Sequence, residues 1–109
     1  MDDTGIRALF VAGGITWRVH AVQEALADAI DQSDLEASIA ADGEVIDDAP
    51  KSPLGSKCLV LCHSQIDGRP LHASVNYAVN PPRVITVYRP DDPQYAGRWS
   101  PDFRKRVGP

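Results

Sequence analysis

The chain has 109 residues, of which 43% are hydrophobic and 24% are charged, and this size supports one domain with a single core but not two. No apolar run approaches the roughly 20 residues that a membrane span requires. Residues 1–4 are acidic where a secretory signal would be basic. We therefore expect a cytoplasmic protein with no membrane partner.

The two halves of the chain carry opposite charge. Residues 1–50 hold 2 basic and 11 acidic side chains, a net charge of −9, whereas residues 51–109 hold 9 basic and 4 acidic side chains, a net charge of +5. Such asymmetry is a recognised indication of nucleic-acid binding by the basic half. The structural alternative is that the two halves neutralise each other across the fold.

Apolar residues repeat at helical spacing in the first forty residues. A first helix is expected from Asp3 to the glycine pair at 13–14, followed by a brief extended segment over residues 15–19. A second helix begins near His20, and a third begins at the Ser33–Glu36 capping box and ends at Gly43. The apolar stripe that predicts burial of the second helix consists of Val22, Ala25, Leu26, Ala29 and Ile30.

After residue 57 the apolar period changes from 3.6 to 2. Strands are expected near residues 45–46 and over 58–63, 71–77 and 84–89, with a loop over 47–57 and a turn at Asp67–Gly68. The fold class is α+β in a single domain, 1–109. Two to three helices (about 3–42) pack on a three- to four-stranded antiparallel sheet (about 44–90), and Tyr95, Trp99 and Phe103 anchor a tail (91–109).

Strand alternation separates a core face from an open face. In the strand after the Asp67–Gly68 turn, His72 lies on the solvated face, and in the last strand Ile85 and Val87 belong in the core while Thr86 and Tyr88 share the open face with His72. Arg69 and Arg89 then border the same edge.

Cys58 and Cys62 precede His63 but do not indicate a metal site or a disulfide. Four residues along a strand span about 13 Å, at about 3.3 Å per residue, which exceeds the reach of a disulfide or of one zinc ion. We expect two buried thiols and no metal.

Six segments in register resemble a widespread bacterial family, domain of unknown function family 4258. They are residues 17–21 (WRVHA), 43–48 (GEVIDD), 58–61 (CLVL), 68–72 (GRPLH), 84–90 (VITVYRP) and 99–106. The resemblance implies a layout similar to the RelE-like and barnase-like ribonuclease toxins, and a zinc-finger antitoxin as protein partner.

This resemblance implies RNA cleavage by attack of the 2′-hydroxyl on the adjacent phosphate, without a metal or other cofactor. By this resemblance, His72 and Tyr88 are expected to act as acid, base or substrate-holding groups, and His20 is a second acid/base candidate. Arg69, Arg89 and Arg104 are the carried-over phosphate or RNA contacts. The structural alternatives are a solvated His72, a Tyr88 at the rim half-buried by the tail, an exposed His20, and surface positions at strand ends for Arg69 and Arg89.

One departure from the family affects the enzyme hypothesis. Members commonly place Arg four and eight residues after the helix His, whereas this chain has Glu24 and Asp28. Three functions therefore stay open: a toxin-like endoribonuclease, a catalytically silent relative that binds a protein partner, and an RNA binder without catalysis.

Overall fold

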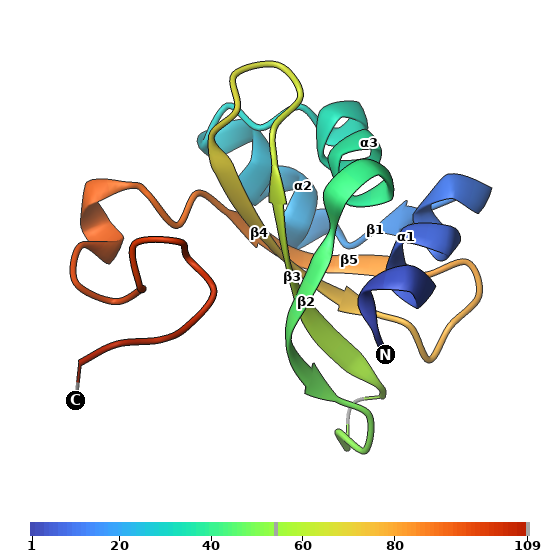
Figure 1. Ribbon diagram of the computed structural model, residues 1–109. Coiled ribbons are helices and arrows are strands. Elements are labelled where there is room, and N and C mark those ends of the chain that lie inside the picture. The colour runs from blue at the N-terminus through green and yellow to red at the C-terminus, as the bar shows by residue number, and fades with distance from the viewer. Residues whose placement is uncertain (54, 109) are drawn as a thin grey trace.

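The computed structural model describes residues 1–53 and 55–108, and within them three helices and a five-stranded sheet form an α+β fold (Figure 1). The helices are α1 (Asp3–Ala12), α2 (Val19–Ala27) and α3 (Gln32–Asp42). The strands are β1 (Thr16–Trp17), β2 (Glu44–Ala49), β3 (Lys57–His63), β4 (Pro70–Asn76) and β5 (Arg83–Tyr88). The α+β class predicted from the sequence is confirmed.

The sheet has the order β1-β5-β4-β3-β2. Strands β2 to β5 form the expected antiparallel meander. The segment before α2 adds a fifth strand, because Thr16 and Trp17 pair in parallel with Arg83 and Val84. The sheet is therefore mixed, and the prediction of a purely antiparallel sheet with three to four strands was too narrow.

The helix termini follow from local capping. The Asp2 side chain accepts a hydrogen bond from the Gly5 amide and caps α1, which ends at Gly13 with a positive φ of 78°. The α3 helix is capped by Asp31, whose Oδ1 accepts from the Asp34 amide at 2.8 Å. The predicted Ser33 cap was wrong because Asp31 already occupies that position.

The buried face of α2 differs from the predicted stripe. Ala21 and Ala25 are the buried residues of this helix, whereas the Leu26 side chain is 75% exposed. The helix lies close to β5, since the Glu24 carboxylate accepts a hydrogen bond from the Val87 amide at 3.3 Å. Small side chains fit this close approach, so the alanines face the sheet and the larger leucine faces solvent.

A bulge changes the faces of β5. Ser74 pairs with Thr86 while Val75 pairs with Val84, which leaves Ile85 as an extra residue. Val84 and Val87 are fully buried in the core as a result. Ile85 is only half-buried, so its predicted place in the core was wrong.

The core lies between the three helices and one face of the sheet, and it contains both cysteines as free thiols. Burial raises the pKa of Cys58 to about 12 and raises that of Cys62 still further. Within residues 1–53 and 55–108, no three metal-binding side chains gather in one group. No helix in these same ranges has the length and apolar character to cross a membrane.

The tail occupies the other side of the sheet, opposite α1 and α3 (Figure 1). After the short 3-10 helix η1 (Pro93–Tyr95), residues 98–107 fold into a small hairpin with a bridge between Trp99 and Arg106. The Ser100 amide donates to the Lys105 carbonyl at 2.7 Å, and the Val107 amide donates to the Arg98 carbonyl at 3.0 Å. The tail thus covers one end of the open face and leaves the other end bare.

Candidate functional site

His72 lies at the covered end of the open face and is fully buried. Its Nε2 is 2.9 Å from the Phe103 carbonyl oxygen, and its Nδ1 is 3.0 Å from the Tyr88 hydroxyl. Because a carbonyl can only accept, Nε2 carries the proton and donates it. Nδ1 therefore accepts from the Tyr88 hydroxyl, and the neutral tautomer is fixed.

Burial keeps both members of this pair uncharged at neutral pH. Desolvation lowers the pKa of His72 to about 4 and raises that of Tyr88 to about 12. The prediction that His72 is solvated was wrong, because alternation places it on the open face but the tail covers that end of the face.

Four rings form a continuous group around this pair. The Trp99 ring meets His72 edge to face with centroids 4.4 Å apart, and Tyr95 lies 5.0 Å from Tyr88. Two guanidinium groups flank the rings, with Arg106 5.4 Å from the Trp99 centroid and Arg98 5.9 Å from that of Tyr95. Both contacts are within cation–π range.

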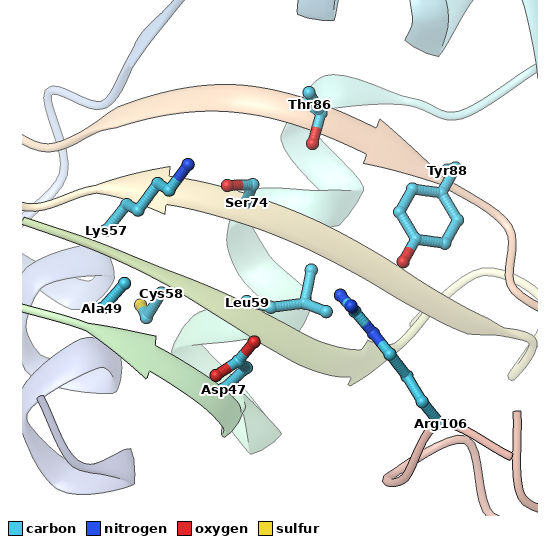
Figure 2. A pocket seen from close by; sticks show the side chains of 9 residues that line it. All are labelled: Asp47, Ala49, Lys57, Cys58, Leu59, Ser74, Thr86, Tyr88 and Arg106. Atoms are coloured by element: carbon cyan, nitrogen blue, oxygen red, sulfur yellow. The ribbon is translucent and has the colours of Figure 1, made fainter. Parts of the chain in front are cut away.

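Several hollows open beside the rings, and two of them share Tyr88. The aromatic hollow has a volume of about 540 Å³ and is lined chiefly by Tyr88, Tyr95, Arg98, Trp99 and Arg106. The sheet hollow, of about 290 Å³, lies on the strands and shares Tyr88 and Arg106 with the first. Figure 2 shows the Arg106 guanidinium reaching from the tail over the sheet, with the Tyr88 hydroxyl directed toward it. Polar groups from four strands complete the sheet hollow: Asp47, Lys57, Ser74 and Thr86.

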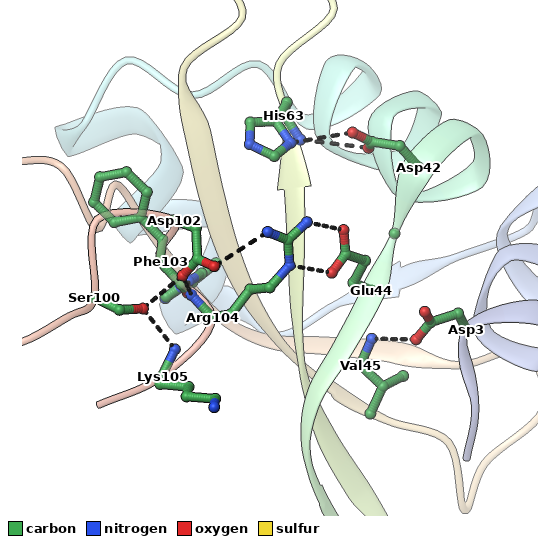
Figure 3. Close-up of polar contacts among 12 residues, drawn as sticks. Asp3, Asp42, Glu44, Val45, His63, Ser100, Asp102, Phe103, Arg104 and Lys105 are labelled. Atoms are coloured by element: carbon green, nitrogen blue, oxygen red, sulfur yellow. Dashed lines mark hydrogen bonds and ion pairs between the residues drawn. The ribbon is translucent and has the colours of Figure 1, made fainter. Parts of the chain in front are cut away.

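Two of the predicted phosphate contacts are held by carboxylates. Arg69 forms a bidentate pair with Asp91 at 2.9 and 3.0 Å. Arg104 forms a bidentate pair with Glu44, with both nitrogen–oxygen distances at 2.7 Å, and also contacts Asp102 (Figure 3). Arg104 therefore attaches the tail to β2, and it lowers the pKa of Glu44.

The remaining predicted residues also make internal contacts. Arg89 donates from Nε to the Asp28 carbonyl at 3.0 Å and from Nη2 to the Ala29 carbonyl at 2.9 Å, so it caps the end of α2. The His20 side chain is 70% exposed, and its Nε2 lies 3.5 Å from the Glu24 carboxylate. Of the six predicted site residues, the structure brings only His72 and Tyr88 into contact.

Sequence reasoning placed Thr86 on the open face but did not name Arg106, Asp47 or Lys57 as site residues. Arg106 is paired with Trp99 across the small hairpin and lies over its ring, whereas Arg104 turns to Glu44. Residues two apart share one face of an extended strand, so alternation alone does not distinguish these two arginines.

The structure also explains why this chain has Glu24 where family members commonly have Arg. The Glu24 carboxylate accepts a hydrogen bond from the Val87 amide of β5, which lies beyond the residues that pair with β1.

The comparison with family models matches residues 17–89 to the family described as "Domain of unknown function (DUF4258)". The match covers more than half of the chain, so this protein belongs to that family, as the sequence resemblance predicted. The searches of curated proteins and of solved structures found no match.

Proposed function

We propose that this protein binds single-stranded RNA across the open face of its sheet. The observation that carries the proposal is the aromatic hollow, in which Tyr95 and Trp99 stand beside Arg98 and Arg106. In the part of the chain that the structure describes, neither arginine forms an ion pair with a carboxylate. Rings and unpaired guanidinium groups in one hollow are the combination that single-stranded nucleic acids require.

Each component matches a part of a nucleotide. Base stacking on an aromatic side chain contributes about 1–3 kcal/mol per base, and guanidinium binds phosphate oxygens in a bidentate manner. The Ser74 and Thr86 hydroxyls face the sheet hollow, where they can exchange hydrogen bonds with the ribose 2′-hydroxyl. Asp47 lines the same hollow and weakens its attraction for anions, so phosphates are expected nearer to Arg106 than to β2.

A binding measurement tests this function. Fluorescence anisotropy with a labelled single-stranded RNA should show saturable, salt-dependent binding that Arg106→Gln and Arg98→Gln each weaken by about tenfold, the effect of losing one charge-assisted hydrogen bond. Lys51→Gln removes the same charge in the β2–β3 loop, away from the aromatic hollow, and should leave binding unchanged. Equal losses in all three variants, or no binding by the wild type, would contradict the proposal.

The contact between Tyr88 and His72 supports a second candidate, the toxin-like endoribonuclease implied by the resemblance. The 2′-hydroxyl attacks phosphorus and the bond to the 5′-oxygen breaks, which leaves a cyclic phosphate and a 5′-hydroxyl. A phenol with a raised pKa suits the acid that protonates the departing oxygen. Arg106 beside it suits stabilisation of the phosphorane.

The charge states favour binding over cleavage as the first proposal. A buried His72 with a pKa of about 4 is a poor base at pH 7, and both of its ring nitrogens already have partners. Asp47 is the carboxylate that faces the same hollow as Tyr88 and would have to serve as base. A RelE-like layout and an antitoxin-type protein partner remain predictions.

Tyr88→Phe separates the two candidates, because it removes the hydroxyl and keeps the ring. If the protein is a nuclease, purified wild type cleaves RNA to cyclic-phosphate ends, and its expression arrests bacterial growth. Tyr88→Phe should abolish both effects while RNA binding persists. Intact RNA after prolonged incubation with wild-type protein, at concentrations that saturate binding, would rule out cleavage.

A further inference from the structure

A third hollow lies at the bare end of the open face, beyond the reach of the tail. This basic hollow has a volume of about 250 Å³ and is lined by Arg18, Lys57, Asn76, Arg83 and Ile85. Arg83 and Asn76 are direct neighbours across β5 and β4. Arg18 is brought beside them because its amide donates to the Val84 carbonyl at 3.0 Å.

The three cations of this hollow have no acidic partner. All three are exposed, and no ion pair or side-chain hydrogen bond of Arg18, Lys57 or Arg83 occurs among the described residues. Other arginines of this acidic chain are paired, as Arg69 is with Asp91 and Arg104 is with Glu44. Like charges that converge without a counter-ion attract an anion from solution.

The basic hollow is continuous with the other two. It shares Lys57 with the sheet hollow, which in turn shares Tyr88 and Arg106 with the aromatic hollow. From Arg83 to Tyr88 the β5 strand rises about 16 Å, at about 3.3 Å per residue. A path of this length with cations at both ends suits an extended single strand of RNA, which carries several phosphates.

We propose that the basic hollow is a second anion site that holds a backbone phosphate of the RNA, while bases stack in the aromatic hollow at the other end. This inference rests on the proposed function for its ligand, but the anion site itself does not. Asn76 supplies a neutral amide donor beside the three cations, which suits phosphate oxygens. The two ends of the face thus contribute differently: the basic hollow contributes salt-dependent affinity alone, whereas the aromatic hollow adds base stacking to the phosphate contacts of Arg98 and Arg106.

The first experiment uses inorganic pyrophosphate as the probe and follows backbone amides by NMR. We expect saturable shifts at residues 57, 76 and 83–85 that disappear in the triple variant Arg18→Gln, Lys57→Gln, Arg83→Gln. Arg69→Gln is the matched control, because Arg69 precedes β4 at the opposite end of the strand from Asn76. Absence of saturable shifts at these positions, or equal shifts in the triple variant, would overturn the anion site.

The second experiment measures RNA affinity against salt concentration. The plot of log affinity against log salt should lose a slope of about 0.7 in the triple variant, because the basic hollow neutralises one phosphate of a single strand. Arg69→Gln should keep the wild-type slope. RNA binding with an unchanged slope in the triple variant overturns this inference and leaves the proposed function standing. Wild type that binds pyrophosphate but no RNA refutes the proposed function instead.

Discussion

The two faces of the sheet are covered in different ways. Three helices cover one face and bury an apolar core of residues such as Leu35, Val60 and Val87. The tail covers only one end of the other face, where the fully buried side chains include the polar His72 and its β3 neighbour Leu61. A face covered completely by apolar packing provides stability, whereas a face covered in part leaves polar groups at the boundary with solvent.

This difference places the candidate site at the edge of the tail. The aromatic hollow exists because the tail hairpin holds Trp99 and Arg106 above β4 and β5. The comparison predicts that substitutions under the helices affect the whole fold, while those under the tail affect the site first.

The largest effect is expected from Leu35→Ala in the helix-covered core. Leu35 is fully buried in the main cluster, and its truncation leaves a cavity that costs about 2–5 kcal/mol. Urea denaturation followed by circular dichroism measures the loss. Val11→Ala, at a side chain 72% exposed on α1, is the control and should change little. A loss below 1 kcal/mol for Leu35→Ala would contradict a tightly packed helix face.

The next effect is a pH dependence from His72. Its pKa is about 4 in the fold and about 6.5 when unfolded, so the unfolded chain binds the proton first. The contribution of neutral His72 to the free energy of unfolding is fully present above pH 6.5 and is lost as the pH falls toward 4. The loss is at most about 3.5 kcal/mol, since the two pKa values differ by about 2.5 and each pKa unit corresponds to about 1.4 kcal/mol.

Unfolding titrations between pH 7 and 4.5 measure this loss in wild type and in His72→Gln. Glutamine can still donate to the Phe103 carbonyl and accept from Tyr88, but it does not titrate. The free energy of unfolding of wild type, relative to that of His72→Gln, should therefore decrease as the pH is lowered from 7 to 4.5. Parallel curves would show that His72 is not buried as a neutral ring.

The sequence predicted the elements of both faces better than it predicted what covers them. The apolar period and the glycines that end two of the helices located the helices and the meander, because these signals are local. The bulge at Ile85 and the exposure of Leu26 were missed, since both depend on how β5 meets its neighbours. The burial of His72 depends on a tail about thirty residues away in sequence, which alternation within one strand cannot reveal.

The site was predictable only as far as direct cross-strand contact extends. His72 and Tyr88 are opposite each other in the β4–β5 register, so alternation alone brought them together. Arg69, Arg89 and Arg104 were chosen as cations at strand ends and in the tail, but each meets a carboxylate or a helix terminus supplied by a distant segment. Arg106 could not be identified as a site residue from the sequence, because its position over Trp99 depends on the hairpin of the tail.

A smaller effect is expected from Trp99→Ala, which removes the ring between His72 and Arg106. Aromatic pairs contribute about 0.5–1.5 kcal/mol and exposed cation–π contacts about 0.5–1 kcal/mol, so the free energy of unfolding should fall by about 1–2.5 kcal/mol. Hydrogen exchange should accelerate at the amides of Ser100 and Val107 but not at those of α3. Uniform acceleration throughout the chain would show that the tail and the helix-covered core unfold as one unit.

The smallest effect is expected from Arg104→Gln, which removes the exposed bidentate pair with Glu44. Exposed ion pairs are weakened by water and salt, so its loss should loosen the tail without lowering global stability by much. Limited proteolysis of the tail at low and high salt measures this loosening. Arg104→Lys keeps the charge but loses the planar guanidinium that binds a carboxylate through two hydrogen bonds. The protease should cleave its tail at a rate between those of wild type and Arg104→Gln.

If high salt makes wild type as sensitive to the protease as Arg104→Gln, charge holds the hairpin to β2. If wild type stays resistant at high salt while Trp99→Ala does not, the ring contacts alone hold the tail over His72, and the aromatic hollow persists without the ion pair.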